Sequence, residues 1–208
     1  MKTKIIVSLI AMTFLWSCST TMQYTWTKEN YEGNNFNKIL VIVESKSAQG
    51  RMDGENGIVD YLAKEGISAS NSFAVFPPNQ NNENLSEDEI EARILAGGYD
   101  GVLITSLVDA KTRDVREGGG TYAQPVAYRY GRHIRRGYVH MQEPEYYREE
   151  RTFVLETRFF DTTDSANKEA VVWSGQSELT DPSSAESAMK SYAKKLVKTL
   201  LDSGTIKI

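Results

Sequence analysis

Residues Lys38–Val43 read KILVIV, and this stretch decides the fold class. A short, continuous run of β-branched and aliphatic side chains is typical of a strand that is buried on both faces, as in a parallel sheet. Parallel neighbours are joined by crossover connections, which are right-handed in nearly all sheets. The residues that follow should therefore alternate between helix and strand.

The chain after KILVIV shows this alternation. Arg51–Glu65 places apolar residues along one helical face, and Gly66 follows as a stop signal. Ile67–Phe76 is expected to be a second strand. Ser86–Glu89 has the pattern of a capping box, which begins another helix, and Asp100–Val108 is a third apolar strand. The order β-α-β-α-β predicts that the first three strands are parallel.

The second half of the chain has a different pattern. Thr152–Thr162 and Glu169–Leu179 alternate apolar and polar residues, and the turn sequence DTTDSAN between them predicts an antiparallel β-β hairpin. From Ser183 onward an apolar stripe at helical spacing predicts a C-terminal helix that packs on the sheet, with Ser183 and Glu186 as its capping box. We therefore expect an α/β fold with an α+β mixed sheet, as a single domain over residues 37–208.

The first residues have the features of a bacterial signal peptide over residues 1–17. Ile5–Leu15 is an apolar run without charge, too short to span a bilayer as a permanent helix. Leu15-Trp16-Ser17-Cys18 follows and resembles the bacterial lipobox. Cys18 is the only cysteine of the chain. The alternative, a buried free thiol in a cytosolic domain, leaves the signal segment unexplained.

The lipobox implies that Cys18 becomes the acylated first residue of the mature chain. Its sulfur would take a diacylglycerol and its amino group an acyl chain such as palmitate, and stable anchoring needs at least two chains. No later segment is apolar for about 18 residues, so contact with the lipid bilayer is expected through Cys18 alone. No acidic residue appears before Glu29, which by resemblance to bacterial sorting rules indicates the outer membrane, facing the periplasm. Residues 18–36 are predicted to be this lipidated N-terminus and a tether.

Residues 117–150 form a long polar insertion between two predicted strands. Structureless loops beyond about 12–15 residues are uncommon, so either a functional long loop or a hairpin is expected. Within it, Val126–Met141 reads VAYRYGRHIRRGYVHM. Tyrosine and arginine are enriched at binding hot spots. We expect this stretch to contact an envelope protein or an anionic glycan, with these candidate residues: Tyr128, Arg129, Tyr130, Arg132, Arg135, Arg136 and Tyr138.

Other chemistries are weaker interpretations of the same insertion. His133 and His140, with Glu143 and Glu145, would suit an enzyme that processes envelope glycan or peptide if they converged. Their spacing is not that of a zinc or iron site, and no metal or cofactor is expected. Arginine and tyrosine also suit single-stranded nucleic acid, but export and a formal net charge of −4 do not.

Two further motifs carry no catalytic prediction. Ser187–Lys190 matches the S-x-x-K pattern of serine penicillin-binding enzymes, but the S-D-N and K-T-G partners of that pattern are missing. Gly118–Gly120 lacks the helix start that a phosphate loop requires. The chain is therefore expected to have no catalytic residue and not to be an enzyme.

The lipobox, KILVIV, GYDGVLI and RFFDTTDSANKEAVVWSG together resemble a broad set of small bacterial envelope lipoproteins. In element order the chain is similar to the curli-secretion (CsgG-like) lipoproteins and to the lipoprotein activators of penicillin-binding proteins. The resemblance implies a non-catalytic binding or assembly role in the envelope and carries over no catalytic residue. No segment resembles the membrane-inserting hairpins of the curli pore, so pore formation is not expected.

Overall fold

The computed structural model describes residues 20–77, 85–130, 133–163, 171–182 and 184–208. The chain divides into two compact units. One holds the residues up to Ala110 and from Thr152 onward, and the other is Lys111–Arg151. Of the described helices, none combines the length and the apolar character that crossing a membrane requires.

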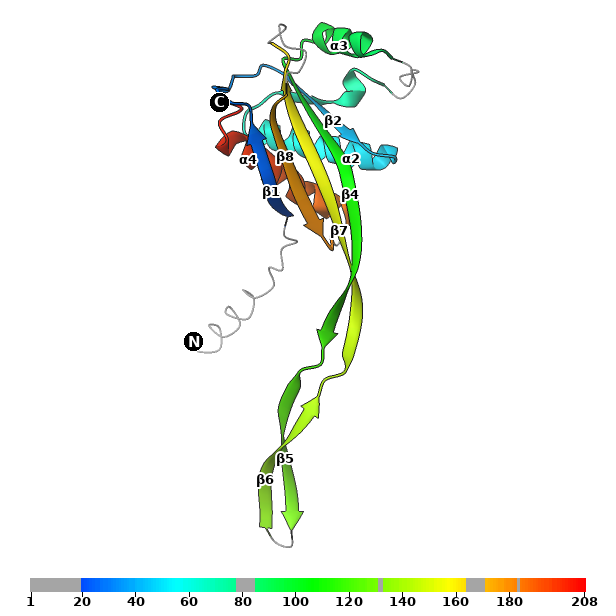
Figure 1. Ribbon diagram of the computed structural model, residues 1–208, viewed down its shortest axis with the longest axis vertical. Helices are drawn as coiled ribbons and strands as arrows, with labels where there is room; N and C mark the ends of the chain where they lie inside the picture. Colours follow the sequence, from blue (N-terminus) through cyan, green and yellow to red (C-terminus); the bar gives the residue numbers. More distant parts are fainter. Residues whose placement is uncertain (1–19, 78–84, 131–132, 164–170, 183) are drawn as a thin grey trace, which may run out of the picture. The chain divides into compact units, whose positions relative to one another are not determined.

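A six-stranded mixed sheet organises the first unit (Figure 1). Its strands, in spatial order, are β1 (Thr20–Thr27), β8 (Val171–Thr180), β7 (Glu145–Asp161), β4 (Gly101–Gly118), β2 (Ile39–Glu44) and β3 (Ala69–Asn71). Strand β2 pairs in parallel with both β3 and β4. Strand β8 pairs antiparallel with β1 and β7. The predicted parallel strands and the predicted antiparallel hairpin are thus confirmed.

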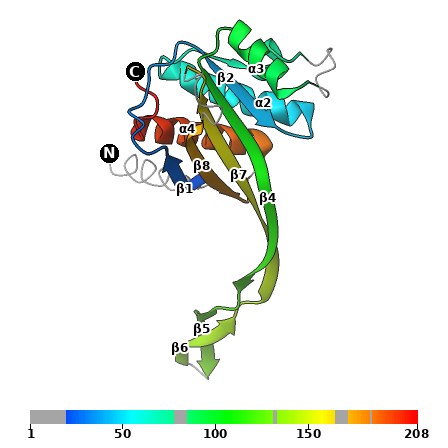
Figure 2. The ribbon, with the colours of Figure 1, turned by 45° about the horizontal axis from the view of Figure 1, so that its top comes forward.

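Helices cover the two faces of this sheet unequally (Figure 2). Helices α2 (Ala48–Lys64) and α4 (Ala185–Asp202) pack against each other over one face. Helix α3 (Glu87–Ala96) lies over the opposite face, and a short 3₁₀ helix, η1 (Ser72–Ala74), follows β3. The predicted C-terminal helix and mixed α+β class are confirmed.

The stretch KILVIV is buried on both faces because the two cores share its side chains. Ile39, Val41 and Val43 belong to the core under α2 and α4. Leu40 belongs to the core under α3, and Ile42 packs against that core. This follows from the alternation of side chains along a strand.

Several boundaries differ from the sequence expectation: β4 continues past Val108 to Gly118, and β7 begins at Glu145 and not at Thr152. Residues Thr20–Thr27 of the predicted tether form strand β1, because Met22 packs on the core and the strand covers the edge of β8. The second strand is only Ala69–Asn71, because the chain turns into η1 at Ser72. Helix α4 is capped by Ser184, which accepts from the amide of Ser187 at 3.1 Å; Ser183 lies outside the described residues.

The second unit is a β-ribbon. Strands β5 (Thr121–Tyr130) and β6 (His133–Gln142) pair antiparallel and are called the hairpin below. The hairpin alternative for the insertion is therefore the one observed. Ion pairs join the strand segments beside it, with Arg113 and Glu150 at 2.5 Å and Arg148 and Glu117 at 2.7 Å. None of its side chains that the structure describes is buried.

Candidate functional site

The hairpin places the predicted contact residues along two paired strands, and the register divides their positions between the two faces of the ribbon. Tyr128 lies opposite Arg135, Ala127 opposite Arg136, and Arg129 opposite Ile134. The side chains of residues 126–137, the whole of Arg132, and Cys18 lie outside what the structure describes. Of the predicted residues, Tyr130 pairs with His133 in the same register, and Tyr138 is described fully and is 73% exposed.

Further apolar side chains of the hairpin are exposed next to the predicted ones. Tyr122 lies opposite Met141, and both are exposed, as is Val139. Residues directly opposite on an antiparallel pair share a face. Tyr122 and Met141 thus extend the candidate contact surface beyond the residues that the sequence singled out.

Tyrosines continue along the ribbon beyond the hairpin. Tyr146 and Tyr147 are exposed on β7. The hydroxyl of Tyr146 donates to the carboxylate of Glu117, and this hydrogen bond and the negative charge raise the pKa of Tyr146. The ribbon therefore fixes one tyrosine by hydrogen bonding and presents the other to solvent.

The histidines and glutamates of the enzyme hypothesis lie along the ribbon. His133 begins β6, and His140 lies seven residues further on the same strand. At about 3.4 Å per residue, their backbones are separated by roughly 24 Å. His140, Glu143 and Glu145 are exposed. Within the described residues, no group of three His, Cys, Asp or Glu side chains could hold a metal ion.

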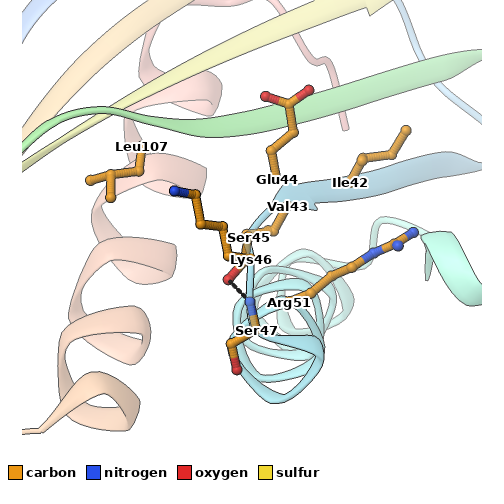
Figure 3. Close-up of a pocket in the computed structure, with 8 residues that line it drawn as sticks. All are labelled: Ile42, Val43, Glu44, Ser45, Lys46, Ser47, Arg51 and Leu107. Atoms are coloured by element: carbon orange, nitrogen blue, oxygen red, sulfur yellow. Dashed lines mark hydrogen bonds between the residues drawn. The ribbon is translucent and has the colours of Figure 1, made fainter. Parts of the chain in front are cut away.

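A cleft that the sequence did not predict lies at the carboxyl end of β2 (Figure 3). Strand β2 lies between β3 and β4. The chain passes from β2 to β3 on one side, and then returns past β2 to β4 on the other side. In open α/β sheets, ligands bind at such a topological switch point. The cleft is lined by Ile42, Val43, Glu44, Ser45, Lys46, Ser47, Arg51 and Leu107.

The helix start beside this cleft is well defined. Ser47 caps α2 by accepting from the amide of Gly50 at 3.3 Å. The amide of Ser47 donates to the hydroxyl of Ser45 at 3.2 Å, as the dashed line in Figure 3 shows. Lys46 extends toward Leu107, whereas Arg51 points away from it.

The guanidinium of Arg51 is already engaged on the protein side. Its Nε donates to Glu55 Oε1 at 3.1 Å, and its Nη2 donates to Ser72 Oγ at 2.5 Å. The same group lies 4.7 Å from the ring centroid of Phe73. Glu55 balances the charge of Arg51. Of the two cationic residues that line the cleft, Lys46 is therefore the better candidate to bind an anion.

An apolar cavity of about 240 Å³ adjoins the cleft. It shares Val43, Glu44, Ser45 and Leu107 with the cleft. Its other lining residues come from α2, the central strands and the start of α4: Gly50, Thr105, Phe153, Leu155, Leu179, Pro182, Ala188 and Met189. A signal in the sequence could have located it: a helix follows a buried parallel strand, and in such units a crevice lies at the carboxyl end of the strand.

The S-x-x-K match is structural. The hydroxyl of Ser187 donates to the backbone carbonyl of Ser184 at 3.1 Å. Lys190 Nζ pairs with Glu186 at 2.8 Å, and this contact raises the pKa of Lys190. A lysine that acts as the general base for a serine nucleophile would instead need a lowered pKa.

No family model matches the chain, and no curated protein matches its sequence. Among solved structures, it is similar to the PelC dodecamer from Paraburkholderia phytofirmans, with a TM-score of 0.46, 12% identity, and coverage of 86% of this chain and 96% of that one. It is also similar to the lipoprotein GNA1162 from Neisseria meningitidis, with a TM-score of 0.42, 16% identity, and coverage of 79% and 98%. TM-scores this low do not establish a common fold, so function is inferred from the chain's own residues. The resemblance to curli-secretion and activator lipoproteins stays a prediction.

Proposed function

We propose that this chain is a lipoprotein of the bacterial outer membrane that faces the periplasm, binds an envelope partner through the hairpin and catalyses no reaction itself. The observation that carries this proposal is the β-ribbon of the second unit. It exposes tyrosine, valine and methionine side chains, and none of its described side chains is buried.

A ribbon of this kind gains little stability from its own contacts. An isolated two-stranded hairpin is marginally stable at best in water, because it cannot bury an apolar face. A partner that covers Tyr122, Val139 and Met141 would supply that burial. Tyr138, opposite Pro125, lies on the other face of the ribbon and offers a partner an exposed aromatic side chain of the type enriched at interface hot spots.

Charge indicates what such a partner presents. Lys111–Arg151 contains nine Lys or Arg and six Asp or Glu, a formal charge of +3, while the whole chain carries −4. Val126–Met141 contains four arginines and no acidic residue. Arginine pairs with carboxylates in two parallel hydrogen bonds. The partner that fits best is an acidic surface of an envelope protein, with an anionic glycan as the alternative.

The anchor is tested by fractionation of cells that make the Cys18→Ala chain. The expected result is loss of the protein from the membrane fraction, since no acyl chain can attach. The matched control is Ser19→Ala, which keeps the cysteine and should remain in membranes. Metabolic labelling with an alkyne palmitate measures acylation directly. A Cys18→Ala protein that still fractionates with membranes would overturn the anchor.

The contact surface is tested by excising the hairpin. The amide of Glu143 donates to the carbonyl of Gly120 at 2.8 Å, so the chain is already closed at the hairpin's base. Thr121–Gln142 is replaced by Asn-Gly, the residues that favour a tight two-residue turn. Cross-linking and mass spectrometry in intact cells should then lose the partners of the full chain, while the unfolding transition of the first unit is kept. Partners that persist would contradict the proposal. Partners of the full chain that are still cross-linked after glycan digestion would exclude the glycan alternative.

A further inference from the structure

The apolar cavity beside β2 opens close to the point where the described chain begins. Thr20, the first residue of β1, lies opposite Leu179 of β8. Its hydroxyl donates to the hydroxyl of Ser191 on α4 at 2.8 Å. Leu179 lines the cavity, and so does Ala188, one helical turn before Ser191. The N-terminus of β1 is therefore held against the elements that form the cavity wall.

Cys18 precedes Thr20 by two residues. Two residues of extended chain span at most about 7 Å, so the Cα of Cys18 can lie no further than this from the Cα of Thr20. An acyl chain attached at the sulfur or the amino group of Cys18 needs only a short path to the cavity.

The lining suits a hydrocarbon. Leu155, Leu179 and Ala188 are buried apolar side chains. Leu107 forms part of the same wall and is 52% exposed. A methylene chain that entered the cavity would cover this leucine.

We propose that the cavity receives one acyl chain of the chain's own lipidated Cys18. This inference rests on the proposed lipidation. The covalent link makes the occupant intramolecular, so its effective concentration at the cavity is high without any headgroup recognition. Sheltering one chain of three leaves two for the bilayer, the number that stable anchoring requires.

This occupant differs from a free fatty acid in what it needs from the cleft. A free fatty acid carries a carboxylate, and Lys46 at the neighbouring cleft would be its counter-ion. An acyl chain on Cys18 has no such charge, so Lys46→Ala should leave its binding unchanged. Loss of shielding in that variant would overturn the proposal in favour of the free acid.

The test uses an engineered thiol at the cavity wall. Acylation consumes the single native cysteine, so a Leu107→Cys variant carries one free thiol at the cavity wall. The matched control is Val108→Cys, the next residue of β4, which is 48% exposed and is not part of the lining. Each variant is made as the full chain, and its maleimide labelling rate is measured in opened membrane vesicles. A second set carries Cys18→Ser as well and is measured in solution.

The expected result is several-fold slower labelling of Leu107→Cys in the lipidated chain than in the Cys18→Ser chain, with no such difference for Val108→Cys. Equal rates for Leu107→Cys in both chains would show that no acyl chain enters. Shielding that persists in the Cys18→Ser chain until delipidation would identify a free amphiphile and also overturn the proposal. The mass of the N-terminal peptide separates these results from failure of the anchor: an unmodified Cys18 would refute the lipidation and this inference together.

Discussion

The backbone amide of Ser72 donates a 2.9 Å hydrogen bond to Oε2 of Glu55, a carboxylate with no exposed surface. The hydroxyl of Ser72 donates to Oε1 of the same group at 2.5 Å, and the amide of Val43 donates to Oε1 at 3.1 Å. One side chain of α2 thus satisfies donors from η1 and from the end of β2. This contact explains why β3 stops after three residues.

Glu55→Ala should lower the free energy of unfolding by about 3 kcal/mol, because removing one partner leaves buried donors and the charge of Arg51 uncompensated. Urea denaturation of the purified domain measures this value. Asp60→Ala, an exposed acidic residue of the same helix, should change it by no more than about 0.5 kcal/mol. Equal effects of the two substitutions would show that the Glu55 contacts are not formed.

Alkaline pH should weaken the fold through Tyr192. Burial raises the pKa of this fully buried tyrosine from 10.0 to about 12. Its contribution is complete below pH 10, where folded and unfolded states are both protonated. Between pH 10 and 12 the unfolded state loses its proton first, so the free energy of unfolding falls as the pH rises. The pKa of Tyr31 is raised in the same direction, by burial and by its 2.8 Å hydrogen bond to Asp161.

The Tyr192→Phe variant distinguishes the contribution of Tyr192 to the pH dependence from that of Tyr31. Thr105 and Thr157, which share the Tyr192 hydroxyl, also bond each other at 2.9 Å, so the substitution should cost only about 1 kcal/mol at neutral pH. Urea denaturation at pH 8 and pH 11 should show a smaller loss of stability for the variant than for the natural chain. A loss of the same size in both would exclude Tyr192 as a source of the pH dependence.

Two glycines should respond to alanine with opposite signs. A Cβ on Gly101 would lie 2.9 Å from the ring of Phe159 and 3.0 Å from that of Phe36, so Gly101→Ala should destabilise by about 1–3 kcal/mol through overpacking. A Cβ on Gly57 would meet nothing closer than 3.8 Å, and Gly57→Ala should stabilise helix α2 by about 0.5–1 kcal/mol. Thermal unfolding of both variants measures the difference, and a shared sign would contradict the packing described around β4.

Tyr138 and Tyr24 form a matched pair for the partner surface, since each is 73% exposed. Tyr138→Ala should leave the unfolding transition within about 0.5 kcal/mol of that of the natural chain while reducing cross-linking to envelope partners several-fold. Tyr24→Ala, in β1, should leave both measurements unchanged. Reduced cross-linking in both variants would mean that exposed tyrosines contribute without regard to the hairpin.

The sequence predicted those elements whose local pattern agrees with their environment. GYDGVLI is an example: Tyr99 is buried, Gly101 makes room for two rings, and the Asp100 carboxylate accepts from the amides of Asn37 and Lys38 at 2.7 and 2.9 Å. Strand β1 was missed because its pairing depends on β8, about 150 residues away, while its own composition is that of a polar linker. The apolar cavity was missed for the same reason, since its walls come from six separate elements, β2, α2, β4, β7, β8 and α4.

Strand β1 also limits how far the domain could lie from the bilayer if Cys18 is acylated as proposed. A flexible segment over residues 19–35 would have had a root-mean-square span of about 23 Å. The distance between the domain and the bilayer would then have varied over a similar range. With pairing from Thr20 onward, a single residue would separate Cys18, acylated as we propose, from the sheet. On this proposal the domain would stay close to the bilayer surface, and a partner embedded in the same leaflet would meet it at a nearly constant distance from the headgroups.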